Sequence, residues 1–157
     1  SFLEFLYNRL YKLYKKNYKS HLSLIFMSDC IFCKIARKEI KAEIVYEDKD
    51  VLAFLDSFPC VEGQVLAIPK KHTAYFIDLN DKDYSNLMLA VKKIARAMQK
   101  TFNPIKVGVI IEGLEVQHVH VKLYPLGKKG FSEIINCKPE FSEKEMKETA
   151  ERIKSSL

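Results

Sequence analysis

The fold of this chain is decided by the stretch Gln117-His118-Val119-His120-Val121-Lys122-Leu123, in which polar and apolar residues alternate. Successive side chains of a β-strand point to opposite faces, so the alternation predicts a strand over 117–124. His118, His120 and Lys122 would then share one polar, cationic face, while the apolar residues between them face the core. Two imidazoles and an ammonium on one face suit a phosphate group. The alternative is an exposed strand face that binds nothing.

The rest of the chain supplies four more strands and three helices. Short apolar runs between polar turns predict strands over 44–47, 51–56, 64–68 and 107–112. A long amphipathic helix capped by Asn80 or Asp81 is expected over 81–102, because apolar residues recur there with the helical period. These residues are Leu87, Val91, Ile94, Met98 and Phe102. A short helix is expected near Ile35, and a capping box of Ser142 and Glu145 predicts a last helix over about 142–154.

Length and composition indicate one soluble globular domain. The chain has 157 residues, of which 48% are hydrophobic and 29% charged, as in ordinary globular proteins. No segment approaches the roughly 20 consecutive apolar residues that a membrane helix needs, so no membrane span is expected.

The net charge of +6 is concentrated at the amino terminus. Residues 1–28 hold five of the 26 basic and one of the 20 acidic side chains, which leaves a net charge of +2 on the other 129 residues. Specific binding of nucleic acid by the whole domain is therefore not expected, and a basic nucleic-acid binder remains only a third class of function. We interpret 1–28 as an appended or poorly ordered basic extension. The alternative is an amphipathic helix for a membrane surface or for targeting.

Cysteine usage indicates a reducing compartment, and we expect a cytoplasmic protein. Two of the four cysteines stand in Cys30-Ile31-Phe32-Cys33, a spacing that lets one turn present two thiolates to a tetrahedral metal ion. A local zinc finger is excluded, because 38 residues separate Cys33 from His72 and 45 separate His72 from His118. Two alternatives remain for the pair, namely half-buried thiols or a redox motif. Cys60 and Cys137 are interpreted as packing residues.

Several stretches of the chain match the sequence pattern of a known family in order and in spacing. They are Cys30-Ile31-Phe32-Cys33-Lys34-Ile35, Val45-Tyr46-Glu47-Asp48, Val51-Leu52-Ala53-Phe54-Leu55-Asp56, Gly63-Gln64-Val65-Leu66-Ala67-Ile68-Pro69-Lys70-Lys71-His72 and His118-Val119-His120. Over residues 30–126 the chain resembles the histidine triad (HIT) hydrolases, a family of small nucleotide-binding proteins related to the nucleoside phosphoramidases.

The resemblance implies an α+β protein with the HIT-like fold. This fold is a five-stranded antiparallel sheet with a long helix, a short amino-terminal helix and a carboxy-terminal helix. Residues 29–157 would form the HIT domain, with the motifs in 30–126. Relatives are usually dimers through the long helix and a sheet edge, so a homodimer is expected.

The resemblance also implies roles for individual residues. His120 would be the nucleophile that attacks the α-phosphorus of a purine nucleotide or nucleotide conjugate, with His118 and Lys122 as its catalytic partners. An imidazole is largely unprotonated at neutral pH, and its second nitrogen must donate to a fixed acceptor, for which we expect a backbone carbonyl. The nucleotide-binding residues would be Asp56, Ser57, Phe54, Gln64 and Gln117. The ligands of one structural Zn²⁺ would be Cys30, Cys33, His72 and His118.

Two main hypotheses about function follow. The first is a hydrolase or transferase that acts on nucleoside phosphoramidates or dinucleoside polyphosphates through a nucleotidyl-histidine intermediate. The alternative is a nucleotide-sensing or protein-interaction module that keeps the pocket but has little turnover. Lys122 at the third triad position, Gln64 in place of another active-site histidine and a short loop over 112–116 favour the alternative. The histidine pair and Asp56 favour the enzyme.

Overall fold

The computed structural model describes residues 30–135, 137 and 139–157. In this part of the chain, five strands form one antiparallel sheet in the order β1-β2-β3-β5-β4. The strands are β1 Ile44–Glu47, β2 Val51–Leu55, β3 Val65–Pro69, β4 Lys106–Ile110 and β5 Val121–Leu126. The helices are α3 Ile31–Ala36, α4 Asp81–Phe102 and α5 Glu143–Lys154, with 3-10 turns η1 Phe76–Asp78 and η2 Gly130–Glu133. The expected α+β fold is confirmed, whereas the extension 1–28 lies outside the described residues.

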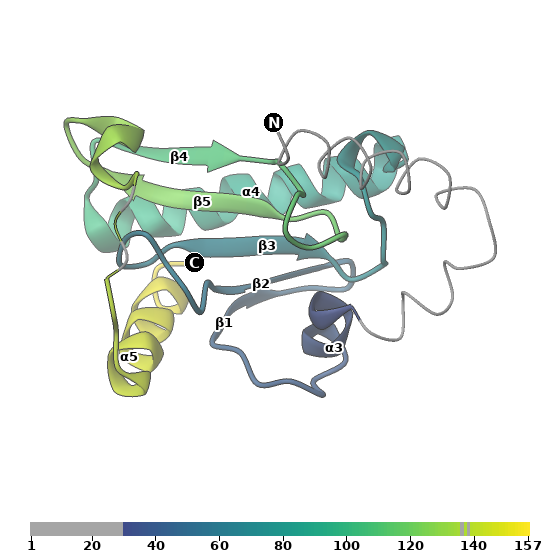
Figure 1. The fold of residues 1–157 in the computed structure, drawn as a ribbon, viewed down its shortest axis with the longest axis horizontal. Helices are drawn as coiled ribbons and strands as arrows, with labels where there is room; N and C mark the ends of the chain where they lie inside the picture. The colour runs from purple at the N-terminus through teal and green to yellow at the C-terminus, as the bar shows by residue number, and fades with distance from the viewer. Residues whose placement is uncertain (1–29, 136, 138) are drawn as a thin grey trace, which may run out of the picture.

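The two faces of the sheet are covered differently (Figure 1). On one face α4 and α5 pack along the sheet, and residues such as Ala67, Ile94 and Ile153 form the larger core. On the other face α3 covers only one end, where Phe32 and Ile35 pack against strands β2 and β3. The middle of this second face therefore carries no helix among the described residues and is free to hold polar side chains.

The long helix α4 has the bounds that the sequence predicts. The side chain of its N-cap Asn80 accepts a hydrogen bond from the Asp83 amide, so of the two candidate caps Asn80 is correct. Asn103 ends the helix in a left-handed conformation with φ 47°. Although α4 has 22 residues, it is amphipathic, and no described helix is long and apolar enough to cross a membrane.

Strand β5 begins at Val121, four residues later than the alternation predicts. Its partner strand explains the difference, because β3 pairs with β5 from Val65 to Ala67 and then ends at Pro69, which has no N–H to donate. The chain before β5 instead bonds to a loop, with the Val119 amide donating to the Thr73 carbonyl. The histidines therefore lie in an irregular segment that leads into the strand.

Gly63, in the turn before β3, is required by its neighbour on α4. Its φ is +76°, and a Cβ at this position would lie 2.3 Å from a ring carbon of Phe102. Gly63→Ala would therefore add both backbone strain and a steric clash, and we expect it to lower the free energy of unfolding by about 2 to 4 kcal/mol. Urea denaturation measures this loss. A loss below about 0.5 kcal/mol, the usual effect of a neutral surface substitution, would contradict the prediction.

Candidate active site and metal centre

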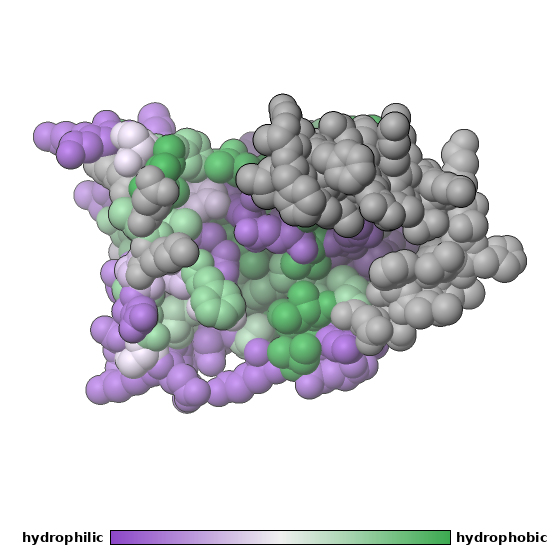
Figure 2. Space-filling model, in the orientation of Figure 1, coloured by the Kyte–Doolittle hydropathy of each residue, from purple (hydrophilic) through white to green (hydrophobic). Residues whose placement is uncertain are grey.

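The candidate residues gather on the sheet face that α3 covers only at one end. Asp56 directly follows β2, Gln64 directly precedes β3, and Lys122 lies in β5, opposite Leu66 of β3. Figure 2 shows this face hollowed near its centre, with polar and apolar residues meeting in the hollow. The strand order therefore brings together side chains that are distant in the sequence.

His120 is held in one tautomer by the backbone. Its Nδ1 lies 2.8 Å from the carbonyl oxygen of His118, which can only accept, so Nδ1 carries the proton. The Nε2 lone pair is left for another partner. The expected backbone acceptor is confirmed. The alternative of an exposed strand face is wrong, because His120 is only 2% exposed and packs its ring against Phe32, with 5.2 Å between ring centroids.

His118 uses both ring nitrogens inside the protein. Its Nε2 donates to the carbonyl of Pro69 at 2.8 Å, which leaves the Nδ1 lone pair facing the sulfur atoms of Cys30 and Cys33 at 3.4 and 3.5 Å. No nitrogen of His118 is therefore left for a substrate. Its connection to His120 runs through its own carbonyl, so it can act on His120 only as a positioning residue.

Cys30, Cys33, His72 and His118 form a compact cluster that fits a tetrahedral ion. Each offers one ligand atom, and these atoms all lie within 4.8 Å of one another. His72 Nδ1 lies 3.3 Å from Cys33 Sγ, close to the roughly 3.6 Å expected between sulfur and nitrogen ligands of one Zn²⁺. The His118 Nε2–H···O=C bond is also the outer hydrogen bond that a metal-binding histidine needs.

The pKa values in the cluster reflect burial. Burial lowers the pKa of His118 to about 4 and shifts that of His72 downward, so both rings are neutral at neutral pH, as ligands must be. Burial, followed by the neighbouring Cys30, raises the pKa of the Cys33 thiol to about 11. A cation between the two sulfurs would reverse that effect and stabilise the thiolates.

Asp56 is fixed by the turn that follows it. Its Oδ1 accepts from the Phe58 amide at 2.9 Å, and its Oδ2 accepts from the Gln64 side chain at 2.6 Å. Gln64, which is buried, also accepts from the Cys60 amide at 2.7 Å through its own oxygen. Both ends of the amide are engaged, so Gln64 orients the carboxylate of Asp56. The sequence predicts direct contact of Gln64 with the nucleotide, whereas in the structure its amide is bonded within the protein.

Lys122 has protein partners that the sequence reasoning missed. Its ammonium lies 2.5 Å from a carboxylate oxygen of Glu112 and 3.7 Å from one of Glu115, both in the loop between β4 and β5. Burial is the largest single influence on the pKa of Lys122, and it lowers that pKa. The contacts with the carboxylates together outweigh burial, so the pKa is raised above its usual value. A lysine that stays charged cannot take over proton transfer from the histidine of the family pattern.

The other candidate residues are less closely tied to the site. Phe54 is buried and packs edge-to-face on Phe32, with 5.7 Å between ring centroids, so it belongs to the core beneath α3. Ser57 and Gln117 are exposed. Phe32 was missed, although its ring contacts both histidine rings. The position of Phe32 between Cys30 and Cys33 in the sequence could have indicated that it lies beside the histidines.

Comparison with known proteins agrees with this geometry. The chain matches the HIT domain family over residues 37–129, and it therefore belongs to the histidine triad family. It is 41% identical over 100 residues to an uncharacterized HIT-like protein of Methanocaldococcus jannaschii, covering 61% of this chain and 78% of that protein. It is also 41% identical over 97 residues to an adenosine 5'-monophosphoramidase of Saccharomyces cerevisiae, covering 61% of each chain.

Solved structures share the fold. A HIT-like protein of Bartonella henselae superposes with a TM-score of 0.72 at 32% identity, covering 82% of this chain and 97% of that one. A histidine triad family protein of Mycobacterium smegmatis, described as Zn-bound, also has a TM-score of 0.72, with coverage of 82% and 93%. Its identity is 22%, so this second likeness extends to the fold alone.

Proposed function

We propose that this protein is a nucleotide hydrolase that uses His120 as its nucleophile. The observation that carries the proposal is the hydrogen bond from His120 Nδ1 to the His118 carbonyl, which leaves Nε2 unprotonated and able to attack. The 41% identity to a yeast adenosine 5'-monophosphoramidase supports a phosphoramidate as the substrate. Asp56, oriented by Gln64, would accept hydrogen bonds from the ribose hydroxyls.

The reaction would proceed in two displacements at the α-phosphorus. In the first, Nε2 of His120 forms a bond to phosphorus while the phosphorus–nitrogen bond breaks, and the amine leaves with the electron pair and takes up a proton from solvent. In the second, water attacks phosphorus and loses a proton, and the bond to His120 breaks with its electron pair returning to the ring. The products are the nucleoside monophosphate and the free amine.

Rapid quenching tests this proposal. Adenosine 5'-phosphoramidate should be converted to the monophosphate. When the reaction is quenched without acid, mass spectrometry should find one adenylyl group on the peptide that contains His120. Binding of the monophosphate without any turnover would contradict the proposal and favour the nucleotide-sensing module instead.

We further propose that Cys30, Cys33, His72 and His118 hold one structural Zn²⁺. Four protein ligands leave no open position for water, so the ion would stabilise the fold without taking part in the reaction. It would join α3 to the segment before β5, and through His118 it would support the carbonyl that holds His120. Cys30, Cys33 and Cys60 are free thiols in the structure, and the cytoplasmic location stays a prediction from cysteine usage.

The homodimer remains a prediction. Leu89 on α4 is 66% exposed and Val109 on the edge strand β4 is 41% exposed, so both elements present apolar side chains to solvent. Met88 and Ala95 widen the apolar stripe of α4 and pack against the core of the same chain, as their place in the core-facing set predicts. We expect a dimer by light scattering at micromolar concentration, and Leu89→Glu should shift the mass toward that of the monomer. A monomeric wild-type protein would contradict the prediction.

A further inference from the structure

Tyr124 follows Lys122 on the same face of β5, and its hydroxyl is not used by the fold. Val121 and Leu123 pack in the larger core, so Lys122 and Tyr124 point to the opposite face, which is the face of the candidate site. Tyr124 is only 6% exposed, yet no hydrogen bond joins its hydroxyl to any of the described residues. A buried tyrosine hydroxyl usually has a hydrogen-bond partner, so this one is available to a ligand.

The hydroxyl of Tyr124 is accessible although its ring is buried. Within the part of the chain that the structure describes, every fully buried side-chain oxygen or nitrogen has a hydrogen-bond partner, so the unpartnered oxygen must reach solvent. The ring packs edge-to-face on Phe131, with 5.5 Å between ring centroids, in a cluster that also holds Ile134 and Cys60. A donor on a ring that is already fixed loses little conformational entropy when a ligand binds.

Strand pairing places Tyr124 at the Asp56 end of the site. Strand β3 pairs with β5 at Val65 and Leu123, so Gln64 and Tyr124 come next on the two neighbouring strands. The Cβ atoms of residues opposite each other in an antiparallel pair are about 5 Å apart. Gln64 donates to Asp56 at 2.6 Å. Tyr124 is therefore a neighbour of the pair that is expected to hold the ribose.

The hydroxyl of Tyr124 is a hydrogen-bond donor at neutral pH. Burial is the largest influence on its pKa and raises it. The charge of Lys122 acts in the opposite direction, whereas Cys60 and Asp56 raise the pKa further, and the pKa lies above its usual value. The phenol therefore keeps its proton, and the groups that act on it are those of the candidate site.

Tyr124 lies too far along the chain to act on His120. Four residues separate them, roughly 13 Å in an extended chain. The ring of His120 packs against Phe32, whereas that of Tyr124 packs against Phe131, so the two side chains belong to different clusters. A nucleotide that reaches both ends would have its phosphorus at His120 and its sugar nearer to Tyr124.

A ribose hydroxyl at Asp56 needs a donor as well as an acceptor. Each hydroxyl donates one hydrogen bond and accepts up to two, whereas a carboxylate only accepts. The Phe58 amide and the Gln64 side chain already donate to Asp56 itself. Ser57 also carries a hydroxyl beside Asp56, but it is exposed, whereas the hydroxyl of Tyr124 is held in place by its packed ring.

We propose that the Tyr124 hydroxyl donates a hydrogen bond to a ribose hydroxyl bound at Asp56, which makes Tyr124 a specificity residue for ribonucleotides. The inference rests on the proposed function and extends it to the sugar of the substrate. A ribose hydroxyl that finds both its acceptor and its donor is favoured, whereas a deoxy sugar leaves the phenol of Tyr124 without a partner.

Three nucleotides test this contact, namely the 5'-monophosphates of adenosine, 2'-deoxyadenosine and 3'-deoxyadenosine. Calorimetry gives the ratio of the Kd of each deoxy compound to that of the adenosine compound, in wild-type protein and in Tyr124→Phe. We expect at least one ratio to fall about fivefold in the variant, because a lost neutral hydrogen bond weakens only the ligand that has the partner hydroxyl. The variant keeps the ring in its apolar cluster, and thermal denaturation checks its stability.

Tyr84→Phe is the matched control. It removes the same hydroxyl from α4, which covers the opposite face of the sheet (Figure 1), and Tyr84 is 44% exposed. Both ratios should stay within about twofold of their wild-type values, as for a surface substitution remote from the site. An equal fall of the ratios in Tyr84→Phe and Tyr124→Phe would overturn the inference.

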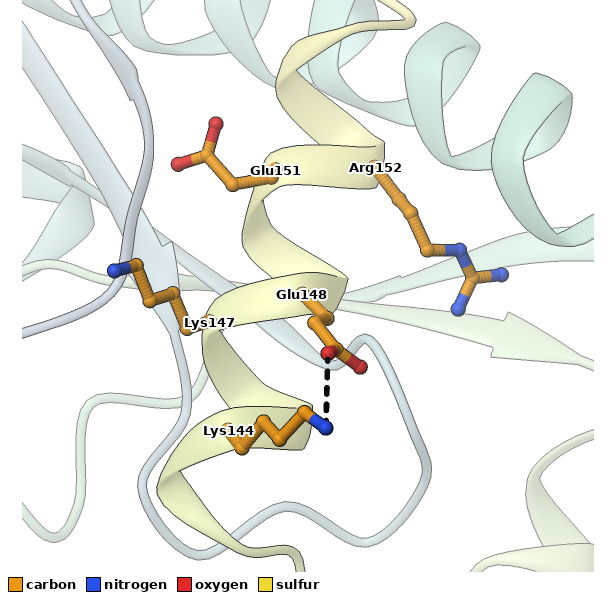
Figure 3. Close-up of a pocket in the computed structure, with 5 residues that line it drawn as sticks. All are labelled: Lys144, Lys147, Glu148, Glu151 and Arg152. Carbon is orange, nitrogen blue, oxygen red and sulfur yellow. Dashed lines mark ion pairs between the residues drawn. The ribbon is translucent and has the colours of Figure 1, made fainter.

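Binding at another hollow of the surface must also be excluded. Figure 3 shows this hollow on α5, where Lys144, Lys147 and Arg152 could attract a phosphate. Lys144 pairs with Glu148 at 3.9 Å. We expect Lys147→Ala to leave all three affinities unchanged within about twofold. A larger loss for all three nucleotides would place their binding on α5 and overturn the inference.

The outcomes separate the sugar contact from the proposed function, because hydrolysis of adenosine 5'-phosphoramidate is measured on the same preparations. If hydrolysis occurs and both ratios in Tyr124→Phe stay within about twofold of wild type, the hydrolase stands and the sugar contact is overturned. If hydrolysis is absent and a ratio falls as expected, the sugar contact stands and the nucleotide-sensing module is favoured. Wild-type protein that binds none of the three monophosphates would overturn the sugar contact.

Discussion

Replacing His120 by alanine or asparagine is expected to reduce hydrolysis of an adenosine phosphoramidate at least about a thousandfold, a loss of roughly 4 kcal/mol of transition-state stabilisation. Binding of the monophosphate should change little, because the bond to phosphorus exists only along the reaction path whereas the contacts of Asp56 persist in the ground state. Single-turnover kinetics and calorimetric binding of the monophosphate measure the two quantities.

A loss of folding must be separated from a loss of chemistry, because the ring of His120 packs on Phe32 in the interior. His120→Gly leaves a space of imidazole size, so added imidazole should restore part of the turnover if the ring acts as a nucleophile. Thermal denaturation of each variant controls for stability. Turnover within about tenfold of wild type in His120→Ala would contradict the assignment.

Purified protein is expected to contain about one Zn²⁺ per chain, and removing a ligand should abolish both binding and much of the stability. Cys33→Ser is the sharpest variant, since Cys33 is 5% exposed and its sulfur lies within 3.5 Å of ligand nitrogens on both His72 and His118. Several kcal/mol of unfolding free energy should be lost, because structural zinc contributes binding energy directly to folding. Elemental analysis and chelator-dependent melting measure both effects.

Cys60→Ser is the matched control for the metal. Cys60 is a free, partly buried thiol that packs against a separate apolar cluster with Tyr124 and Ile134. The variant should retain the ion and the response to chelator. Protein that is purified without chelator and contains no metal would contradict the zinc site and favour the alternative of half-buried thiols.

The elements of this fold were predictable where their determinants lie within a few residues of one another. Helix α4 begins and ends as expected, because Asn80 satisfies the amide three residues later and the apolar stripe continues to Phe102. The capping box of Ser142 and Glu145 likewise starts α5 where the sequence predicts. Helix capping and the helical repeat of apolar residues depend on residues a few positions apart, so one segment of sequence contains the information that sets the helix bounds.

The site residues became recognisable through their spacing and the resemblance that the motifs carry. The tautomer of His120 could be anticipated, since a nucleophilic imidazole needs an acceptor for its second nitrogen. The same motifs predicted the four members of the cysteine and histidine cluster, although the ligand atoms come from residues as far apart as Cys30 and His118. In both cases the chemistry of the side chains, an imidazole that needs an acceptor and thiols and imidazoles that bind metal, limited which partners each could have.

Long-range pairing decided the remaining features. The start of β5 depends on Pro69, which cannot donate to a strand partner, and the alternation around His120 holds no information about that neighbour. The charge of Lys122, at the third triad position, depends on its ion pair with Glu112, ten residues earlier in the chain. Glu112 comes close to Lys122 because β4 and β5 pair at Ile110 and Lys122. Residue types and local periods determined which chemical groups this protein possesses and which helices it forms. The pairing of the strands decided that Lys122 meets Glu112, and a buried or paired charge takes its properties from neighbours brought close by folding.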